Sequence, residues 1–151
     1  MDTDQPHSQE FFPRLSPEIS TQLATRVRVR LETALYSKDE IAGVLRVTVA
    51  RNATPTAYEK QWVWGHAHLA LTNGIFIRYL HVAEASRGQG FGSHLLYEAT
   101  KLGRTLGMHV HINTPAANTR TRMFLRANGF SESIFWYTPK KLLMVRYMQM
   151  P

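Results

Sequence analysis

The stretch that decides the fold runs from residue 80 to residue 96 and reads LHVAEASRGQGFGSHLL. It joins a β-rich segment, residues 75–82, to a segment in which apolar residues recur every three or four positions, as on one face of a helix. That apolar series is Phe91, Leu95, Ala99, Leu102 and Leu106. Glycines between a strand and a helix let the backbone turn tightly and bring several N–H groups together, and the start of the helix adds its dipole. The stretch therefore predicts a strand, a turn that suits a phosphate group, and a helix.

Downstream of this helix the sequence predicts a strand, a second helix and two further strands. Gly107 suits the end of the first helix, and residues 109–114 read as a short strand. Asn118 is a good cap for a helix over residues 118–128, and Gly129 follows its end. Two β-rich segments then stand on either side of Thr138-Pro139, at residues 130–137 and 142–148.

Upstream, residues 1–15 read as a disordered polar leader, and a single domain is expected over residues 16–151. Ser16-Pro17-Glu18 is a helix start, and apolar residues at a four-residue spacing predict an amphipathic helix that ends near Ser37. Three strands are expected next, at residues 41–50, 61–72 and 75–82, with Asn73-Gly74 as a type I′ turn between the last two. The order of elements predicts a mixed α/β domain built around one sheet.

Composition excludes several classes of protein. The chain has 151 residues, of which 44% are hydrophobic and 19% charged, so it is long enough for a buried core and is not a disordered tail. It has no cysteine, which excludes disulfides, iron–sulfur clusters and cysteine nucleophiles. No apolar run approaches the roughly 18 residues of a membrane helix, and the acidic start is unlike a signal peptide. We therefore expect a cytoplasmic protein without a membrane partner.

The charge is basic and uneven. The net charge is +7, with −2 on residues 1–40 and +9 on residues 41–151. Such a surface attracts an anionic partner, which leaves a phosphorylated cofactor, a nucleic acid or an acidic surface open.

Two motifs resemble those of the GNAT (Gcn5-related N-acetyltransferase) superfamily. Arg87, Gly90 and Gly92 occupy the positions of its acyl-CoA signature, Arg/Gln-x-x-Gly-x-Gly/Ala. Asn118, Phe124 and Gly129-Phe130 resemble the helix that follows the next strand in that family. The resemblance implies the GNAT-like α/β fold: a mixed, mostly antiparallel sheet flanked by helices, with one splayed pair of strands that admits acyl-CoA.

The resemblance also implies an activity and its binding residues. The activity is direct transfer of an acyl group, usually acetyl, from acetyl-CoA to an amine on a small molecule or a protein. The Val82 N–H would stabilise the oxyanion, and Asn118 would contact the pantetheine arm. The residues that would hold the pyrophosphate and the pantetheine are Leu80, Val82, Arg87, Gly88, Gln89, Gly90, Phe91 and Gly92.

Both usual catalytic positions of the family depart from its pattern. The position of the tyrosine acid holds Leu125, and a common position of the base holds Arg78, which stays protonated at neutral pH. A water relay with an unassisted thiolate leaving group is one route that remains. Tyr79 and His81 are the candidates for side-chain catalysis.

A two-residue turn at Asn73-Gly74 predicts which residues share a face of the sheet. Tyr79 and His81 would lie with His66 and His68 on one face, and Phe76, Arg78, Leu80 and Val82 on the other. The resemblance to the GNAT superfamily implies that this second face is the active one. A metal is not expected, because no carboxylate accompanies these histidines. His109 and His111 are expected to be structural.

Several alternatives stay open. Trp62, Trp64, Trp136 and Tyr137 could line an acceptor pocket or belong to the core, and Arg120, Arg122 and Arg126 could meet a CoA phosphate, RNA or solvent. The protein could also be a CoA-binding module without turnover, or acetylate an RNA-linked amine such as aminoacyl-tRNA. A homodimer is a further expectation from the resemblance.

Overall fold

The computed structural model describes residues 7–8, 17–52 and 72–151. Their strands form one sheet in the order β1-β2-β3-β4-β5-β7-β6. Neighbouring strands are antiparallel except for β4 and β5, which are parallel, so the predicted mixed, mostly antiparallel sheet is confirmed. The elements are β1 His7–Ser8, α1 Pro17–Thr25, β2 Arg28–Ser37, β3 Glu40–Ala50, β4 Gly74–Val82, α3 Phe91–Leu106, β5 Val110–Pro115, α4 Thr119–Ala127, β6 Ser131–Tyr137 and β7 Leu143–Gln149.

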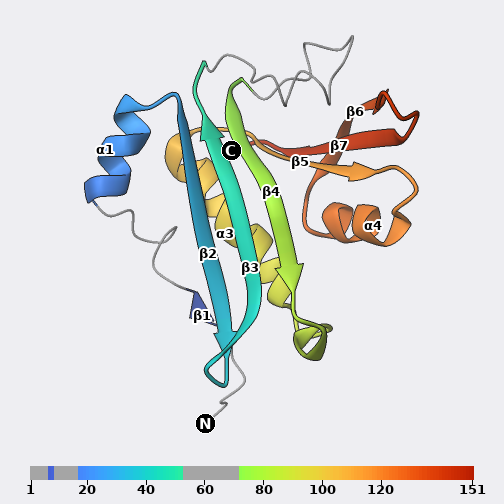
Figure 1. Ribbon diagram of the computed structural model, residues 1–151, viewed down its shortest axis with the longest axis horizontal. Helices are drawn as coiled ribbons and strands as arrows, with labels where there is room; N and C mark the ends of the chain where they lie inside the picture. Colours follow the sequence, from blue (N-terminus) through green and yellow to red (C-terminus); the bar gives the residue numbers. More distant parts are fainter. Residues whose placement is uncertain (1–6, 9–16, 53–71) are drawn as a thin grey trace.

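One large apolar cluster joins the three described α-helices to the sheet. Helix α3 lies across β2, β3 and β4 (Figure 1), and its residues Leu95, Ala99 and Leu102 are fully buried. Leu23 of α1 and Leu125 of α4 belong to the same cluster. The described helices therefore cover one face of the sheet.

The predicted first helix is only half right. Helix α1 ends at Thr25, and the segment that was expected to continue it is the long strand β2, with Val29, Leu31 and Leu35 buried. A spacing of four is a multiple of the two-residue period of a strand, so the apolar series fits both structures. Arg51 N–H bonds to the Val27 carbonyl oxygen at 2.8 Å, which ties the start of β2 to the end of β3.

Strands β4 and β5 form a fork. Their register has only two pairs, Ile75 with Val110 and Phe76 with His111, and beyond these the strands diverge (Figure 1). Strand β4 pairs along its whole length with β3 on its other edge, from Gly74 to Val82. The edge of β4 that faces the fork is therefore open from about Arg78 onward, as the predicted splayed pair requires.

A bulge at Arg78 corrects the predicted faces of β4. Val47 pairs with Ile77 and Arg46 with Tyr79, so Arg78 has no partner of its own in the register. Leu80 and Val82 thus pack on the core with Ile77. The expected active face is split: Phe76 and Arg78 lie with Tyr79 and His81 on the face away from α3, and Leu80 and Val82 lie on the α3 face. A one-residue bulge reverses the alternation of all later side chains.

The type I′ turn expected at Asn73-Gly74 is wrong, because Asn73 lacks the positive φ that such a turn requires at both central residues. The other expected elements match the structure or fall outside the described residues. The expected strands 41–50, 109–114, 130–137 and 142–148 appear as β3, β5, β6 and β7, and the helix after Asn118 appears as α4. The expected strand 61–72, with His66 and His68, lies outside the described residues except for Thr72. So does the expected leader, apart from His7–Ser8, which pair with Tyr36 and Leu35.

Candidate functional site

The glycine loop adopts a backbone that favours glycine. Gly88 and Gly90 have φ of +79° and +82°, and a Cβ at either position would meet nothing within 4 Å. The left-handed backbone, not a lack of space, is therefore what calls for glycine. Gly90 caps α3, and its carbonyl oxygen accepts the first helical bond from His94 N–H at 3.0 Å. The first turn of the helix thus presents its N–H groups at this point.

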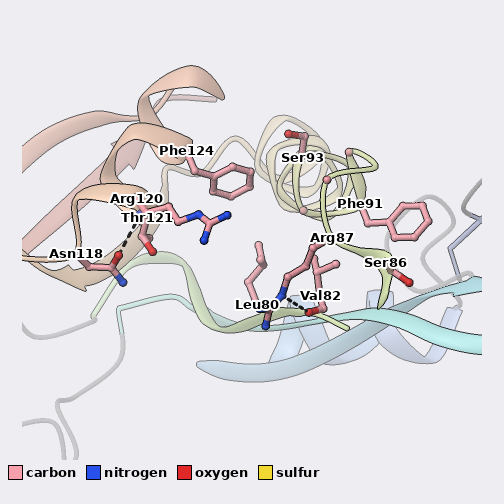
Figure 2. Close-up of a pocket in the computed structure, with 13 residues that line it drawn as sticks. Leu80, Val82, Ser86, Arg87, Phe91, Ser93, Asn118, Arg120, Thr121 and Phe124 are labelled. Carbon is pink, nitrogen blue, oxygen red and sulfur yellow. Dashed lines mark hydrogen bonds between the residues drawn. The ribbon is translucent and has the colours of Figure 1, made fainter. Parts of the chain in front are cut away.

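Arg87 ties the loop to the end of β4. Its Nε donates to the carbonyl oxygen of Val82 at 3.3 Å, and its backbone N–H bonds to Glu84 at the end of a short 3₁₀ turn, Glu84–Ser86. The guanidinium is held beside the open edge of the strand (Figure 2).

A cavity of about 640 Å³, here called the main cavity, lies between the end of β4, the start of α3 and the start of α4. Figure 2 shows Leu80 and Val82 on one side of it, with α4 and the start of α3 across from each other. Every predicted cofactor-binding residue lines it except Gln89. The lining residues are Leu80, Val82, Ser86, Arg87, Gly88, Gly90, Phe91, Gly92, Ser93, Asn118, Arg120, Thr121 and Phe124.

The wall formed by α4 was only partly foreseen. The side chain of Asn118 accepts from Thr121 N–H at 3.2 Å, so it caps the helix as predicted. Arg120 points from the same turn into the main cavity (Figure 2). The ring of Phe124 lies against Gly92, where a Cβ would come within 3.1 Å of it.

Arg122 and Arg126, which the sequence grouped with Arg120, have another role. Both bond to the Glu132 carboxylate of β6, Arg122 at 2.7 Å, and Tyr147 donates to the same oxygen at 3.0 Å. These partners hold the pKa of Glu132 down at about 2, with Arg122 the largest cause. The network fixes α4 to β6 and β7.

Leu125 does not face the main cavity. It is 1% exposed and belongs to the core cluster, and it is not among the residues that line the cavity. The leucine that stands in place of the family's tyrosine acid therefore belongs to the core and not to the cavity wall.

Tyr79 and His81 lie together on the face away from α3. Their ring centroids are 6.0 Å apart, and the guanidinium of Arg46 lies 5.0 Å from the Tyr79 ring. Tyr79 is 42% exposed. Neither residue lines the main cavity.

A smaller hollow of about 170 Å³, here called the second pocket, opens at the fork. The ring of His111 stacks on that of Phe76 with centroids 4.8 Å apart. Burial, and then the charge of Arg146, lower the pKa of His111 to about 4, so its imidazole is neutral at pH 7. The lining residues are Phe76, Ile77, Arg78, His111, Ile112 and Asn113.

Arg146 of β7 is a buried cation beside the second pocket. Its Nε donates to Asn113 Oδ1 at 2.8 Å, and its guanidinium lies 5.8 Å from the Phe76 ring and 5.6 Å from that of Trp136. Burial, and then the charge of Arg78, lower its pKa to about 10, which leaves it protonated at neutral pH.

The sequence pattern does not predict this cluster. It predicts a structural role for His111 and does not mark Asn113 or Arg146 as site residues. The signal was present in the alternation of His109, His111 and Asn113, because polar residues on one face of a central strand need a reason to be there. Of the predicted aromatic residues, Trp136 is buried beside Arg146, Tyr137 is exposed, and Trp62 and Trp64 lie outside the described residues.

The described residues contain no group of three or more histidine or acidic side chains that could hold a metal ion. None of the described helices is long and apolar enough to cross a membrane.

The sequence model of the Acetyltransferase (GNAT) family matches residues 4–130, well over half of the chain. The chain belongs to this family. Both motifs, from Arg87 to Gly92 and from Asn118 to Gly129, lie within the match. A comparison with curated proteins finds no match to this GNAT chain.

Solved structures share the fold at low identity. The ribosomal-protein-S18-alanine N-acetyltransferase from Escherichia coli is 12% identical with a TM-score of 0.60, covering 97% of this chain and 93% of its own. A Bacillus subtilis acetyltransferase in complex with CoA is 17% identical with a TM-score of 0.57. The match covers 90% of this chain and 84% of that protein. A Bacillus anthracis protein in complex with acetyl coenzyme A is 15% identical with a TM-score of 0.61, covering 81% of this chain. This GNAT chain spans 63% of the length of that last protein.

Proposed function

We propose that this protein transfers an acetyl group from acetyl-CoA to the nitrogen of an amine. The observation that carries the proposal is the main cavity, which joins a left-handed glycine loop at the start of α3 to the open edge of β4. Two of the solved structures with this fold contain CoA or acetyl coenzyme A.

The residues of the main cavity fit the parts of acetyl-CoA. The loop around Gly88 and Gly90 turns N–H groups toward the cavity, which suits the pyrophosphate. Arg87 and Arg120 add two positive charges at its rim. Phe124 and Leu80 offer apolar contact to the pantetheine arm, and Asn118 stands beside them.

The open edge of β4 can bind the pantetheine amides and the thioester oxygen. Ala83 N–H bonds to Ala42 of β3 at 2.7 Å. Because successive residues of a strand turn their N–H groups to opposite edges, Val82 N–H faces the fork. The bond from Arg87 to the Val82 carbonyl oxygen agrees with this direction.

Acetyl-CoA supplies the acetyl group as an activated thioester. Val82 N–H stabilises the negative charge on the carbonyl oxygen while the amine nitrogen bonds to the carbonyl carbon. The carbon–sulfur bond then breaks, and the sulfur leaves as a thiolate, which needs no acid because a thiol pKa lies near 8.5. We propose Tyr79 and His81 as the side chains that move the amine proton to solvent, since they lie on the same face of the sheet as Phe76 and Arg78, which line the second pocket.

The acceptor is an amine of a small molecule or a protein, and the protein would act in the cytoplasm. An RNA-linked acceptor is less well supported than the sequence suggested, because Arg122 and Arg126 are engaged by Glu132. A CoA-binding module without turnover is the second candidate, favoured by Leu125 and Arg78 at the usual catalytic positions.

Binding and turnover test the proposal separately. CoA and acetyl-CoA should raise the melting temperature, because a ligand that binds only the folded state stabilises it. At a hundredfold excess over Kd the free energy of unfolding should increase by about 2.7 kcal/mol. CoA release should then be followed with a thiol reagent over a panel of amines, for the wild type, Tyr79→Phe and His81→Ala. No melting shift at millimolar CoA would reject the cofactor assignment, and a shift without turnover would favour the module.

A loss of about a hundredfold in Tyr79→Phe or His81→Ala, with the CoA shift kept, would support side-chain proton transfer. Unchanged rates in both variants would leave the water relay as the route for the proton.

A further inference from the structure

Strand β6 forms one edge of the sheet, and its outer side is open. Of the described strands it pairs with β7 alone (Figure 1). In the described part of the chain, no backbone hydrogen bond joins its outer side to another segment. Proteins usually protect such an edge with a lysine, a proline or a covering element, because it can pair with a strand of another chain. The stretch Ile134–Tyr137, which reads IFWY, holds neither a charge nor a proline.

The hairpin that joins β6 to β7 determines which backbone groups point outward. Thr138 N–H donates to the Leu142 carbonyl oxygen at 2.9 Å, so this pair turns its groups toward the partner strand. Hydrogen-bonded and non-hydrogen-bonded pairs alternate along an antiparallel ladder. The backbone groups of Tyr137 and of Phe135 therefore face the open edge, whereas those of Trp136 face β7.

A bond on the other side of β7 agrees with this assignment. Tyr137 is paired with Leu143, whose carbonyl oxygen accepts from Ala116 N–H at 2.9 Å, on the side away from β6. The groups of this pair thus point away from each other. Phe135 and Tyr137 each present one N–H donor and one carbonyl acceptor to the open edge.

The side chains of the same two residues are exposed. Phe135 is 45% exposed and Tyr137 is 62% exposed. Both lie on the side of the sheet that carries α4, where the guanidinium of Arg122 lies 5.6 Å from the Phe135 ring. Exposed aromatic rings beside open backbone groups indicate a surface that binds another strand.

We propose that two copies of this chain pair through β6, antiparallel and centred on Trp136, so that the two sheets become one continuous sheet. In this register Phe135 of one copy lies opposite Tyr137 of the other, and the outward N–H and carbonyl groups of each such pair bond to one another. The two aromatic rings of each pair lie side by side across the contact. The expected homodimer thereby has a specific surface and register.

The register follows from the positions of the outward groups. If the pairing were centred one residue earlier, Tyr137 would lie opposite Ser133, which is the bulged residue of β6. If it were centred one residue later, Phe135 would lie opposite Pro139, which has no N–H to donate. Only the pairing centred on Trp136 satisfies every outward group of Phe135 and Tyr137.

A second copy suits this edge because the outward residues stand symmetrically about Trp136. The same groups can then serve both partners of a two-fold contact. The stretch from Ser133 to Pro139 is uncharged, so self-pairing brings no like charges opposite each other. The contact is narrow, and we therefore expect a dimer that dissociates on dilution.

Sedimentation equilibrium tests the proposal with paired substitutions. The wild type should show twice the mass of one chain at high concentration. Phe135→Lys with Tyr137→Lys sets like charges opposite each other and should give a monomer at the same concentration. Phe135→Glu with Tyr137→Lys sets opposite charges there and should restore the dimer. Tyr97→Lys, which removes a ring that is 48% exposed on α3, is the matched control and should leave the dimer intact.

Hydrogen exchange tests the register in the unmodified protein. The amides of Phe135 and Tyr137 should be protected in the dimer and exchange rapidly after dilution to the monomer. The amide of Trp136, which faces β7, should stay protected in both states.

A wild type that is monomeric at high micromolar concentration would overturn the inference. So would a dimer that survives Phe135→Lys with Tyr137→Lys, or a dimer in which the amides of these two residues exchange rapidly. A charge-swapped variant that folds but stays monomeric would overturn the register. Circular dichroism shows whether each variant folds, and the exchange measurement decides the inference where one does not.

Discussion

The ring of Phe76 stacks on that of His111 at the last register pair before β4 and β5 part. The contact closes the narrow end of the fork on the face away from α3, while Ile75 and Val110 close it on the core side. One pair of strands thereby separates two hollows of different character. The main cavity is lined by the glycine loop, and the second pocket by Phe76, Arg78 and His111.

The histidine of this stack should titrate far below an ordinary imidazole. By NMR, the pKa of His111 should lie near 4 instead of 6.5, because burial and Arg146 oppose its charge. Since the unfolded chain then binds more protons between pH 6.5 and 4, this group should lower stability as the pH falls through that range. His111→Phe should show a smaller loss of melting temperature from pH 7 to pH 4.5. A His111 resonance that titrates near pH 6.5 would contradict the described burial.

Gly90 and Gly107 offer a matched pair of substitutions. Both have a positive φ, both have open space around a Cβ, and they cap opposite ends of α3. Replacing either with valine should cost similar stability, about 1–2 kcal/mol or more, through the left-handed backbone. Only Gly90→Val should also weaken CoA binding, measured as the CoA-dependent melting shift. Equal shifts in the two variants would show that the loop does not hold CoA.

Leu125 should matter for stability and not for chemistry. Leu125→Ala should destabilise the fold by about 2–5 kcal/mol, since it leaves a cavity in the core. Leu125→Tyr should cost about 1–3 kcal/mol through overpacking, because the side chain starts in the core and not at the cavity wall. Denaturant unfolding measures both. A rate gain in Leu125→Tyr at unchanged stability would contradict this placement.

Glu132 should stabilise the fold above its depressed pKa. The pKa of about 2 lies below the ordinary 4.5, so this contribution is complete above pH 4.5 and is lost as the pH falls toward 2. Glu132→Gln should lower the melting temperature at pH 7, and the difference from wild type should shrink in acid. Glu32→Gln, which removes the exposed pair with Arg46, serves as the control and should change little.

Local signals predicted much of this structure. The glycines around Gly90 and the cap at Asn118 were readable because each depends on backbone geometry within a few residues. The resemblance predicted the part of the main cavity formed by β4, the glycine loop and Asn118, but not the contributions of Arg120 and Thr121. The segment of β2, residues 28–37, was wrongly predicted to be helical because its four-residue apolar spacing suits a strand as well as a helix.

The errors at the site have non-local causes. The bulge at Arg78 arises from the pairing of β4 with β3, about thirty residues away, and it reversed the faces assigned to Leu80 and Tyr79. Arg146 reaches Asn113 across 33 positions of sequence. No spacing rule within a strand brings these residues together.

The place of β7 in the sheet bears on when this site can form. Strand β7 is the last described strand in the chain, yet it lies between β5 and β6, and β6 pairs with no other described strand. During synthesis, β6 can join the sheet only after residues 143–149 have left the ribosome, because its described partner is β7. Arg146 and Tyr147, the anchors of the second pocket and of α4, arrive in that same segment. We therefore expect a nascent chain that ends before β7 to contain the glycine loop but to lack both the fixed position of α4 opposite it and the bond from Arg146 to Asn113.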